Sequence, residues 1–306
     1  MFRYILPLLF LAGLSRYPLA AQNDFPLWYL DKESQYPGRS YIASLGEGKT
    51  IAEAEAAAVS QVSLFFNTST EVRKEAIREF NEALINNTTE FSKKTYISEN
   101  AVITSEQEFL GIRFTNPWQD QKRGVWVVLA YIDRREAAQM YDSKIAANMA
   151  AINSLEADAE NQSETLYAVS LLYRGLRLCD ITEEFIRTAA VVDTSAGKRH
   201  EPDTAKIQAL RSEYRAKKDR LSFSIKMRSP ENSGRVERRL ADLFEDNGFV
   251  VASAPAMYTL NVRITAEEET NNAGNFVTPG ITVRVERDGK TLFSYNKNYE
   301  RSGHRT

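Results

Sequence analysis

The chain is poor in the side chains that most often bind metals or form covalent catalytic sites. Its 306 residues include one cysteine, Cys179, and two histidines, His200 and His304. A single thiol excludes an intramolecular disulfide, so stability has to come from buried apolar surface. Zinc sites draw on several Cys and His ligands, and a catalytic thiol needs a base beside it, so neither is expected. Cys179 falls in a helical pattern and is expected to be a small buried side chain.

The chain also lacks an excess of charge of one sign and a recognisable catalytic motif. Lys plus Arg number 39 against 41 Asp plus Glu, so no nucleic-acid partner is expected. Carboxylates cluster at Glu183-Glu184 and Glu267-Glu268-Glu269, but such runs usually form solvated surfaces. A glycosidase needs two carboxylates facing one cleft, which sequence cannot show. We therefore expect no catalytic, cofactor-binding or metal-binding residue.

Residues 1–21 have the features of a secretory signal peptide. Arg3 gives a positive start, residues 4–14 are apolar, and Leu19-Ala20-Ala21 is an acceptable cleavage site. The alternative, a transmembrane anchor, needs about 20 apolar residues. Residues 11–14 also resemble a bacterial lipobox, but Leu14 stands where the lipidated cysteine would be. The sequence predicts an exported protein of the periplasm or outer-membrane periphery, without a membrane span in the mature chain.

Residues 41–66 are the stretch around which the chain is organised. The run from Tyr41 to Leu45 is rich in strand formers. Gly46 and Gly48 predict a tight turn after it. Thr50 and Glu53 have capping-box spacing, so each side chain is expected to bond the other's backbone N–H. The helix that follows carries an apolar stripe of small and large residues: Ile51, Ala54, Ala58, Val62 and Phe65.

The same stretch offers a second interpretation as a phosphate-binding loop. Residues 43–50 fit a relaxed version of that motif, which lies between a strand and a helix. However, Glu47 would place a carboxylate among the phosphates, and only Asp133 is available as a later Mg²⁺ ligand. A capped helix after a glycine turn explains the same residues, so we favour it and expect no cofactor.

The rest of the chain divides into three blocks. In the first, a helix is expected at 71–85, a weaker strand at 95–104, and strands at 108–115 and 124–132, the latter buried on both faces, with a loop at 116–123. Asp133 is expected to cap a run of helices at 134–161, 163–190 and 204–218, with a loop at 193–202. The last block alternates between strands at 220–227, 249–251, 258–265, 281–287 and 291–295 and a helix at 234–247 ended by Gly248. Its Asp288-Gly289 pair predicts a type I′ hairpin turn.

These elements predict an α+β fold with two small sheet domains, each a helix on an antiparallel sheet, joined by a helical spacer. The expected boundaries are 26–136, 137–218 and 219–306. The last five residues echo Gly46-Glu47-Gly48-Lys49-Thr50, so the second domain is expected to be incomplete, with another helix following Thr306.

The first domain resembles the twenty-kilodalton bacterial envelope lipoprotein family. The resemblance rests on Pro26-Leu27-Trp28-Tyr29, Tyr41-Ile42-Ala43, Gly46-Glu47-Gly48, the alanine-spaced helix at 52–58 and the strand at 126–130. The same module resembles the N-terminal part of FlgT-type flagellar-assembly proteins. The resemblance implies an envelope or flagellum-associated structural role without catalysis. Its module-defining residues here are Trp28, Tyr41, Gly46, Gly48, Thr50 and Glu53.

Three functions are therefore weighed. The first is a non-enzymatic envelope protein that assembles with envelope or flagellar proteins, with homo-oligomerisation left open. The second is a periplasmic ligand-binding protein with a cleft between the two sheet domains. The third is an extracytoplasmic hydrolase that uses a carboxylate pair.

Overall fold

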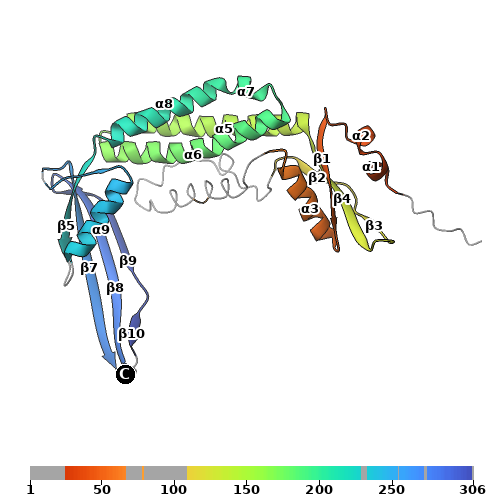
Figure 1. The fold of residues 1–306 in the computed structure, drawn as a ribbon. Helices are drawn as coiled ribbons and strands as arrows, with labels where there is room; N and C mark the ends of the chain where they lie inside the picture. The colour runs from red at the N-terminus through yellow and green to blue at the C-terminus, as the bar shows by residue number, and fades with distance from the viewer. Residues whose placement is uncertain are drawn as a thin grey trace, which may run out of the picture.

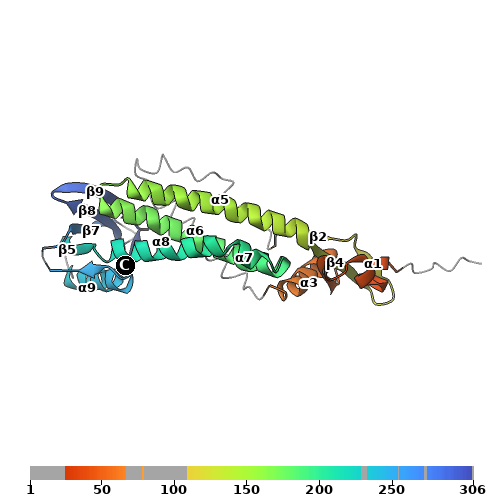
Figure 2. The ribbon, with the colours of Figure 1, turned by 90° about the horizontal axis from the view of Figure 1, so that it is seen from above.

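The computed structural model describes residues 25–66, 78, 109–228, 233–253, 255–271 and 274–304. The expected signal peptide and the expected strand at 95–104 lie outside these residues, as does the helix at 71–85 apart from Arg78. The described chain is elongated, with two sheet units at opposite ends of a helical bundle (Figures 1 and 2). The predicted α+β class, with two sheets and a long helical region, is confirmed.

The first unit is a small antiparallel sheet with one helix packed on it. Its central strand is β4 (Val125–Asp133), which pairs with β1 (Tyr41–Gly48) on one side and with β2 (Ile112–Phe114) and β3 (Trp118–Asp120) on the other. The run of buried residues Val127, Val128, Leu129 and Ala130 confirms the prediction of a strand buried on both faces. The expected loop at 116–123 is wrong in part, because it contains β3.

Helix α3 (Ile51–Ser63) covers this sheet with small side chains. Ala54, Ala58 and Val62 are fully buried, as the predicted stripe requires, but Ile51 and Phe65 are 38% and 50% exposed. Phe66 takes the place expected for Phe65, because the chain leaves the helix in a turn at Leu64 and Phe66 stacks on Phe109. Two short helices, α1 (Leu27–Leu30) and α2 (Lys32–Gln35), precede β1.

The described part of the bundle consists of three long helices. They are α5 (Arg134–Glu160), α6 (Thr165–Val192) and α8 (Glu201–Lys218), with the short α7 (Ala196–Arg199) before α8. Asp133 caps α5 through the Glu136 N–H, as predicted. The expected loop at 193–202 is wrong in part, because it contains α7 and the start of α8. Among the described residues, no helix combines the length and apolar composition needed to cross a membrane.

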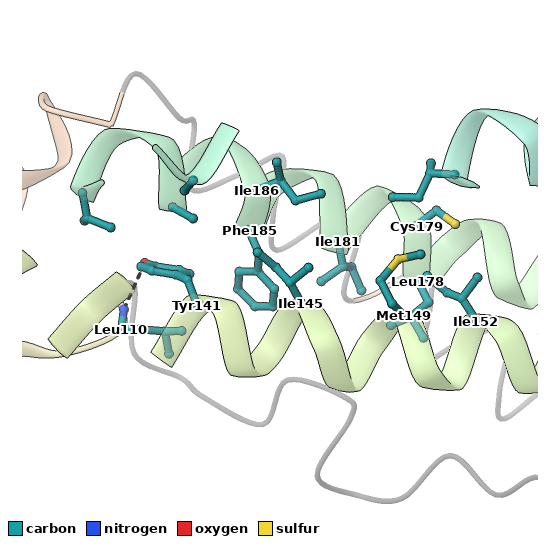
Figure 3. Packing of buried hydrophobic residues seen from close by; sticks show 14 of the residues in the cluster. Leu110, Tyr141, Ile145, Met149, Ile152, Leu178, Cys179, Ile181, Phe185 and Ile186 are labelled. Carbon is teal, nitrogen blue, oxygen red and sulfur yellow. Dashed lines mark hydrogen bonds between the residues drawn. The ribbon is translucent and has the colours of Figure 1, made fainter. Parts of the chain in front are cut away.

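Apolar side chains of α5 and α6 interlock along the bundle. In Figure 3, Tyr141 and Ile145 of α5 face Phe185 and Ile181 of α6, and Met149 lies against Leu178. Cys179 is fully buried, and burial raises the pKa of its thiol to about 12. The prediction of a small buried cysteine is therefore confirmed.

The second unit is a mixed sheet with α9 (Ser233–Asp246) on one face. Its order is β10 (Ser302–His304), β8 (Gly274–Arg287), β7 (Tyr258–Asn271), β5 (Ser222–Arg228) and β6 (Val250–Val251), and β9 (Lys290–Asn298) also pairs with β8. Because β5 pairs in parallel with both β6 and β7, the purely antiparallel sheet expected here is wrong for this unit. Asp288 and Gly289 have φ of 51° and 76°, which confirms the predicted turn. The hairpin of β7 and β8 extends well beyond α9 (Figure 1).

Candidate functional site

A group of charged residues connects the first sheet to the bundle. We call it the joint, and it consists of Arg134, Asp142, Asp193, Arg199 and His200. As the first residue of α5, Arg134 follows the central strand directly. Its backbone N–H donates to the Ser40 carbonyl (2.9 Å), and its Nε donates to the Gly38 carbonyl (3.0 Å). Its Nη1 donates to the carbonyls of Val191 (2.8 Å) and Val192 (3.3 Å). These last two carbonyls belong to the final turn of α6, where backbone acceptors lack helical partners. One side chain therefore connects three segments that are distant in sequence.

Arg199 makes a second set of contacts in the same joint. Its Nη1 lies 2.6 Å from Asp193 Oδ2, and its Nη2 lies 3.0 Å from Asp142 Oδ2. The hydrogen bond from Arg199, with further bonds from Ser195, holds the pKa of Asp193 below its usual range. Asp193 is the C-cap of α6, so this pair also fixes the turn between α6 and α7.

His200 is buried in this joint between two carboxylates. Its Nε2 lies 2.8 Å from Asp142 Oδ1, and its Nδ1 lies 2.7 Å from Asp203 Oδ2. An imidazolium can donate both hydrogen bonds, whereas a neutral ring can donate only one. This arrangement was not predicted from the sequence. Asp203 was visible three residues later on the same helix, but Asp142 is 58 residues away.

A pocket of about 1010 Å³ opens at this joint. Its lining comes from the start of β1, the first turns of α5 and the end of α6, and it includes the charged residues Arg39, Asp133, Arg134, Arg135, Asp142, Asp193 and Arg199. Most of these bond to one another or to backbone, but Arg39 and Arg135 are exposed and form no ion pair with a described residue. The pocket can therefore accommodate a small polar ligand beside two exposed guanidinium groups.

Gly46 and Gly48 have a structural role different from the tight turn predicted for them. Gly46 and Gly48 lie within β1 rather than in a turn. A Cβ added at Gly46 would lie 2.1 Å from the Ala54 carbonyl oxygen and 2.2 Å from the Ala58 nitrogen. A Cβ at Gly48 would lie 2.6 Å from the Ala54 nitrogen. The glycines are thus needed for the close approach of α3 to β1, and they form no phosphate-binding loop.

The capping box is present with one changed partner. The Glu53 N–H donates to Thr50 Oγ1 (3.2 Å), as predicted. The Glu53 carboxylate accepts from the Lys49 N–H (2.8 Å) instead of the Thr50 N–H. The carboxylate of Glu47, which would repel a bound phosphate, accepts a hydrogen bond from Arg123 Nη1 (2.8 Å). The Nε of the same arginine lies 2.6 Å from Asp120 Oδ2.

The aromatic residues before β1 lie against the first sheet. Tyr29 packs on Trp118 of β3 with ring centroids 5.1 Å apart, and Trp28 contacts the Tyr29 ring edge-on. Tyr41 packs edge-on against Tyr131 of β4 at 6.1 Å. The residues singled out from sequence therefore gather on the first sheet. The pocket takes only Tyr41 from that set.

The carboxylate runs noted in the sequence lie elsewhere. Glu183 accepts from Arg211 of α8, and Glu184 pairs with Arg187 one turn along α6. The residues Glu267, Glu268 and Glu269 belong to β7, at the opposite end of the molecule from the pocket. In the described part of the chain, no cluster of three or more His, Cys, Asp and Glu side chains could hold a metal ion.

Comparison with known proteins gives two distant structural likenesses. No protein-family model and no curated protein matches the chain. The lipoprotein GNA1162 from Neisseria meningitidis is 13% identical with a TM-score of 0.23, over 27% of this chain and 83% of that one. The secreted protein HP1454 from Helicobacter pylori is 9% identical with a TM-score of 0.39, over 83% and 85%. Both TM-scores lie below 0.5, so neither likeness decides the family or the function.

Proposed function

We propose that the chain is an exported, non-enzymatic envelope protein that holds two binding units at a fixed separation. The observation that carries this proposal is the placement of the two sheet units at opposite ends of the bundle (Figure 1). Helix α6 has 28 residues, which corresponds to a length of about 42 Å. A spacer of three packed helices keeps such a distance far better than a flexible linker does.

Both ends of the spacer are joined by specific polar contacts. Arg134 joins the first sheet to the end of α6. At the other end, Tyr167 of α6 donates to the Leu292 carbonyl of β9 (2.7 Å), and Arg287 of β8 lies 3.2 Å from Glu164. These contacts oppose rotation of either unit about the bundle axis, which supports a structural rather than a catalytic role.

The sequence of residues 26–136 resembles the envelope lipoprotein and FlgT-type module, and this resemblance is the reason for proposing an envelope setting and flagellar association. The test is cell fractionation with photocrosslinking in native cells. Crosslinkers are placed at exposed Leu27 in the first unit and Lys290 in the second, with exposed Ser212 of α8 as the mid-bundle control. We expect recovery in the envelope fraction and distinct adducts from the two ends. Recovery in the cytosol, or adducts only from Ser212, contradicts the proposal.

The pocket supports a second candidate, a periplasmic ligand-binding protein. A cleft formed directly between the two sheet units is absent from the described structure, since the units lie at opposite ends of the bundle (Figure 1). The binding site would instead be the joint pocket with Arg39 and Arg135. A thermal-shift screen of sugars, peptides and peptidoglycan fragments tests this candidate. A saturable shift that is lost in Arg135→Ser favours it, and no shift from any compound rejects it.

A further inference from the structure

The sheet of the second unit has one apolar and one polar face. Its apolar face consists of alternate residues such as Phe223, Leu260, Val262 and Val285, and it packs under α9. The ring centroids of Phe223 and Phe244 of α9 lie 5.1 Å apart, which fixes the side that the helix covers. Because successive side chains of a strand point to opposite faces, the intervening residues of each strand lie on the far side from α9.

The register of the strands gathers four cations on this uncovered face. Lys226 of β5 pairs with Asn261 of β7, which pairs with Arg284 of β8. In the next row, Arg228 pairs with Arg263, which pairs with Thr282. Paired residues share a face, so these rows place the cations Lys226, Arg228, Arg263 and Arg284 together. All four side chains are exposed, and within the described chain none forms an ion pair.

The four neighbouring cations repel one another, which destabilises the folded chain. The fold itself does not require charged residues at these positions. Adjacent strands lie about 4.8 Å apart, so the bases of the Arg228 and Arg263 side chains are direct neighbours of like charge. An exposed sheet face accepts any polar residue, as the Ser, Thr and Asn residues of the neighbouring rows show. Four cations that have no ion-pair partner among the described residues therefore indicate a surface that attracts an anion.

The cationic patch is compact. Residues two apart in a strand are separated by about 6.7 Å, and two strand spacings make about 9.6 Å. Glu286 lies beyond Arg284 on the same face, and Glu267 lies beyond Arg263, so acidic residues bound the patch at both ends. A patch of this size matches one or two phosphate groups rather than a long polyanion. One arginine guanidinium can donate two parallel hydrogen bonds to the oxygens of a phosphate group.

The neutral neighbours of the patch carry hydroxyl and amide groups. They are Ser224, Thr259, Asn261, Thr265, Thr282, Ser294 and Asn296, all in rows of the same face. Such groups both donate and accept hydrogen bonds, as sugar hydroxyls do. The rows of the patch, from residues 224 to 228, 259 to 265 and 280 to 286, carry no aromatic side chain on this face, whereas single-stranded nucleic acids are usually held by stacking on aromatics.

We propose that the face formed by Lys226, Arg228, Arg263 and Arg284 binds a phosphorylated sugar. The phosphate groups lie among the cations, and the sugar hydroxyls bond the surrounding Asn, Ser and Thr side chains. The source of such a group can be a free sugar phosphate or the headgroup of a glycolipid. This site is separate from the joint pocket and does not depend on the spacer role.

The test is calorimetric titration of the full chain with glucose 1,6-bisphosphate, with maltose as the neutral sugar. The double variant Arg228→Ser, Arg263→Ser removes the paired arginines. The matched control Arg235→Ser, Arg239→Ser removes two exposed arginines of α9, which covers the other face of the same sheet. We expect saturable binding of the bisphosphate that is weakened at least about tenfold in the first variant and less than about twofold in the control.

Vesicles distinguish the two sources. Wild type is sedimented with phosphatidylcholine vesicles that carry a phosphorylated glycolipid, and with plain phosphatidylcholine vesicles. The proposal is supported if wild type binds the free sugar bisphosphate, or only the glycolipid vesicles, and if the double variant Arg228→Ser, Arg263→Ser loses that binding. The arm that shows binding identifies the source of the phosphorylated sugar. No binding in either arm, equal losses in both double variants, or tighter binding of a single-stranded oligonucleotide at the same arginines overturns the proposal.

Discussion

The phenolic hydroxyl of Tyr258 donates a hydrogen bond to the Glu164 carboxylate, and this contact joins the bundle to the second sheet. Glu164 is the N-cap of α6, and Tyr258 is the first residue of β7 and fully buried. The same hydroxyl accepts from the Leu166 N–H (3.2 Å), and Arg287 lies 3.2 Å from the carboxylate. Desolvation, with the adjacent carboxylate, raises the pKa of Tyr258 to about 12, so the hydroxyl keeps its proton at neutral pH.

Replacement of Glu164 tests how much this contact between the bundle and the second sheet stabilises the chain. Desolvation opposes ionisation of Glu164, but the bonds from Tyr258, Leu166 and Arg287 outweigh it and lower its pKa. A lowered carboxyl pKa contributes stability above the unfolded-state value, and that stability is lost as pH falls through the folded-state value. Glu164→Gln should therefore lower the free energy of unfolding by about 1–3 kcal/mol at neutral pH. The difference from wild type should shrink as the pH falls below 4.5.

Urea unfolding across this pH range provides the measurement. Glu160→Gln is the control, because Glu160 is exposed near the same turn and no described partner bonds to its side chain. The control should differ from wild type by less than about 0.5 kcal/mol. A pH-independent loss in Glu164→Gln would show that packing, rather than charge, holds this contact.

Gly46→Ala tests the contact between α3 and β1. The added methyl group meets two backbone atoms of the helix, at 2.1 and 2.2 Å, so the helix itself has to move. We expect a loss of at least about 2 kcal/mol in the free energy of unfolding. Gly197→Ala is the control, because nothing lies within 4 Å of its Cβ position, and it should be neutral or slightly stabilising. Equal unfolding midpoints for the two variants would disprove the close approach.

Local signals in the sequence predicted the elements, while contacts between distant residues could not be predicted from it. Thr50, Asp133 and the Asp288-Gly289 pair act within a few residues, so their caps and turn were predicted correctly. The strand character of Gly46 and Gly48 depends on pairing with Val128 and Trp126, some 80 residues later. Strand β7 continues to Asn271 through three glutamates, because β8 pairs with it from Thr259 to Asn271.

The residues around the joint pocket show again that contacts between distant residues could not be predicted from the sequence. Asp133 and Arg134 are adjacent in sequence, and the cap was predicted from that position alone. The bonds from Arg134 to Val191 and from His200 to Asp142 span 57 and 58 residues and depend on how α6 and α8 return along α5. The charged faces of the helices were visible in the sequence, but the pairing of those faces was not.

Arg134→Gln tests the joint between the first sheet and the bundle. Loss of the bonds to Gly38 and Val191 frees carbonyls in the last turn of α6 and should allow that turn to fray. We expect faster hydrogen exchange at residues 189–193 and a loss of about 1–3 kcal/mol in unfolding free energy. Arg135→Gln is the control, since its side chain is exposed beside the pocket. Unchanged exchange in Arg134→Gln would show that apolar packing alone fixes the joint.

Asn148 occupies a core position of α5 where an apolar residue would be expected. The buried positions 138, 141, 145, 148, 152, 155 and 159 alternate spacings of three and four residues, which is the pattern of a packed helical seam. Asn148 is fully buried, and neither its Nδ2 nor its Oδ1 has a hydrogen-bond partner among the described residues. An unsatisfied buried amide costs about 1–3 kcal/mol.

Asn148→Leu replaces this amide with an apolar group of similar shape and should raise the free energy of unfolding by about 1–2 kcal/mol, measured by urea titration of the helical circular dichroism. The opposite sign is expected for Asn161→Leu at the end of the same helix, because Asn161 Nδ2 donates to the Ala157 carbonyl (2.9 Å) and caps the final turn. If Asn148→Leu unfolds at a lower urea concentration than wild type, the amide has a hydrogen-bond partner in solution beyond the described residues, as a buried water would provide.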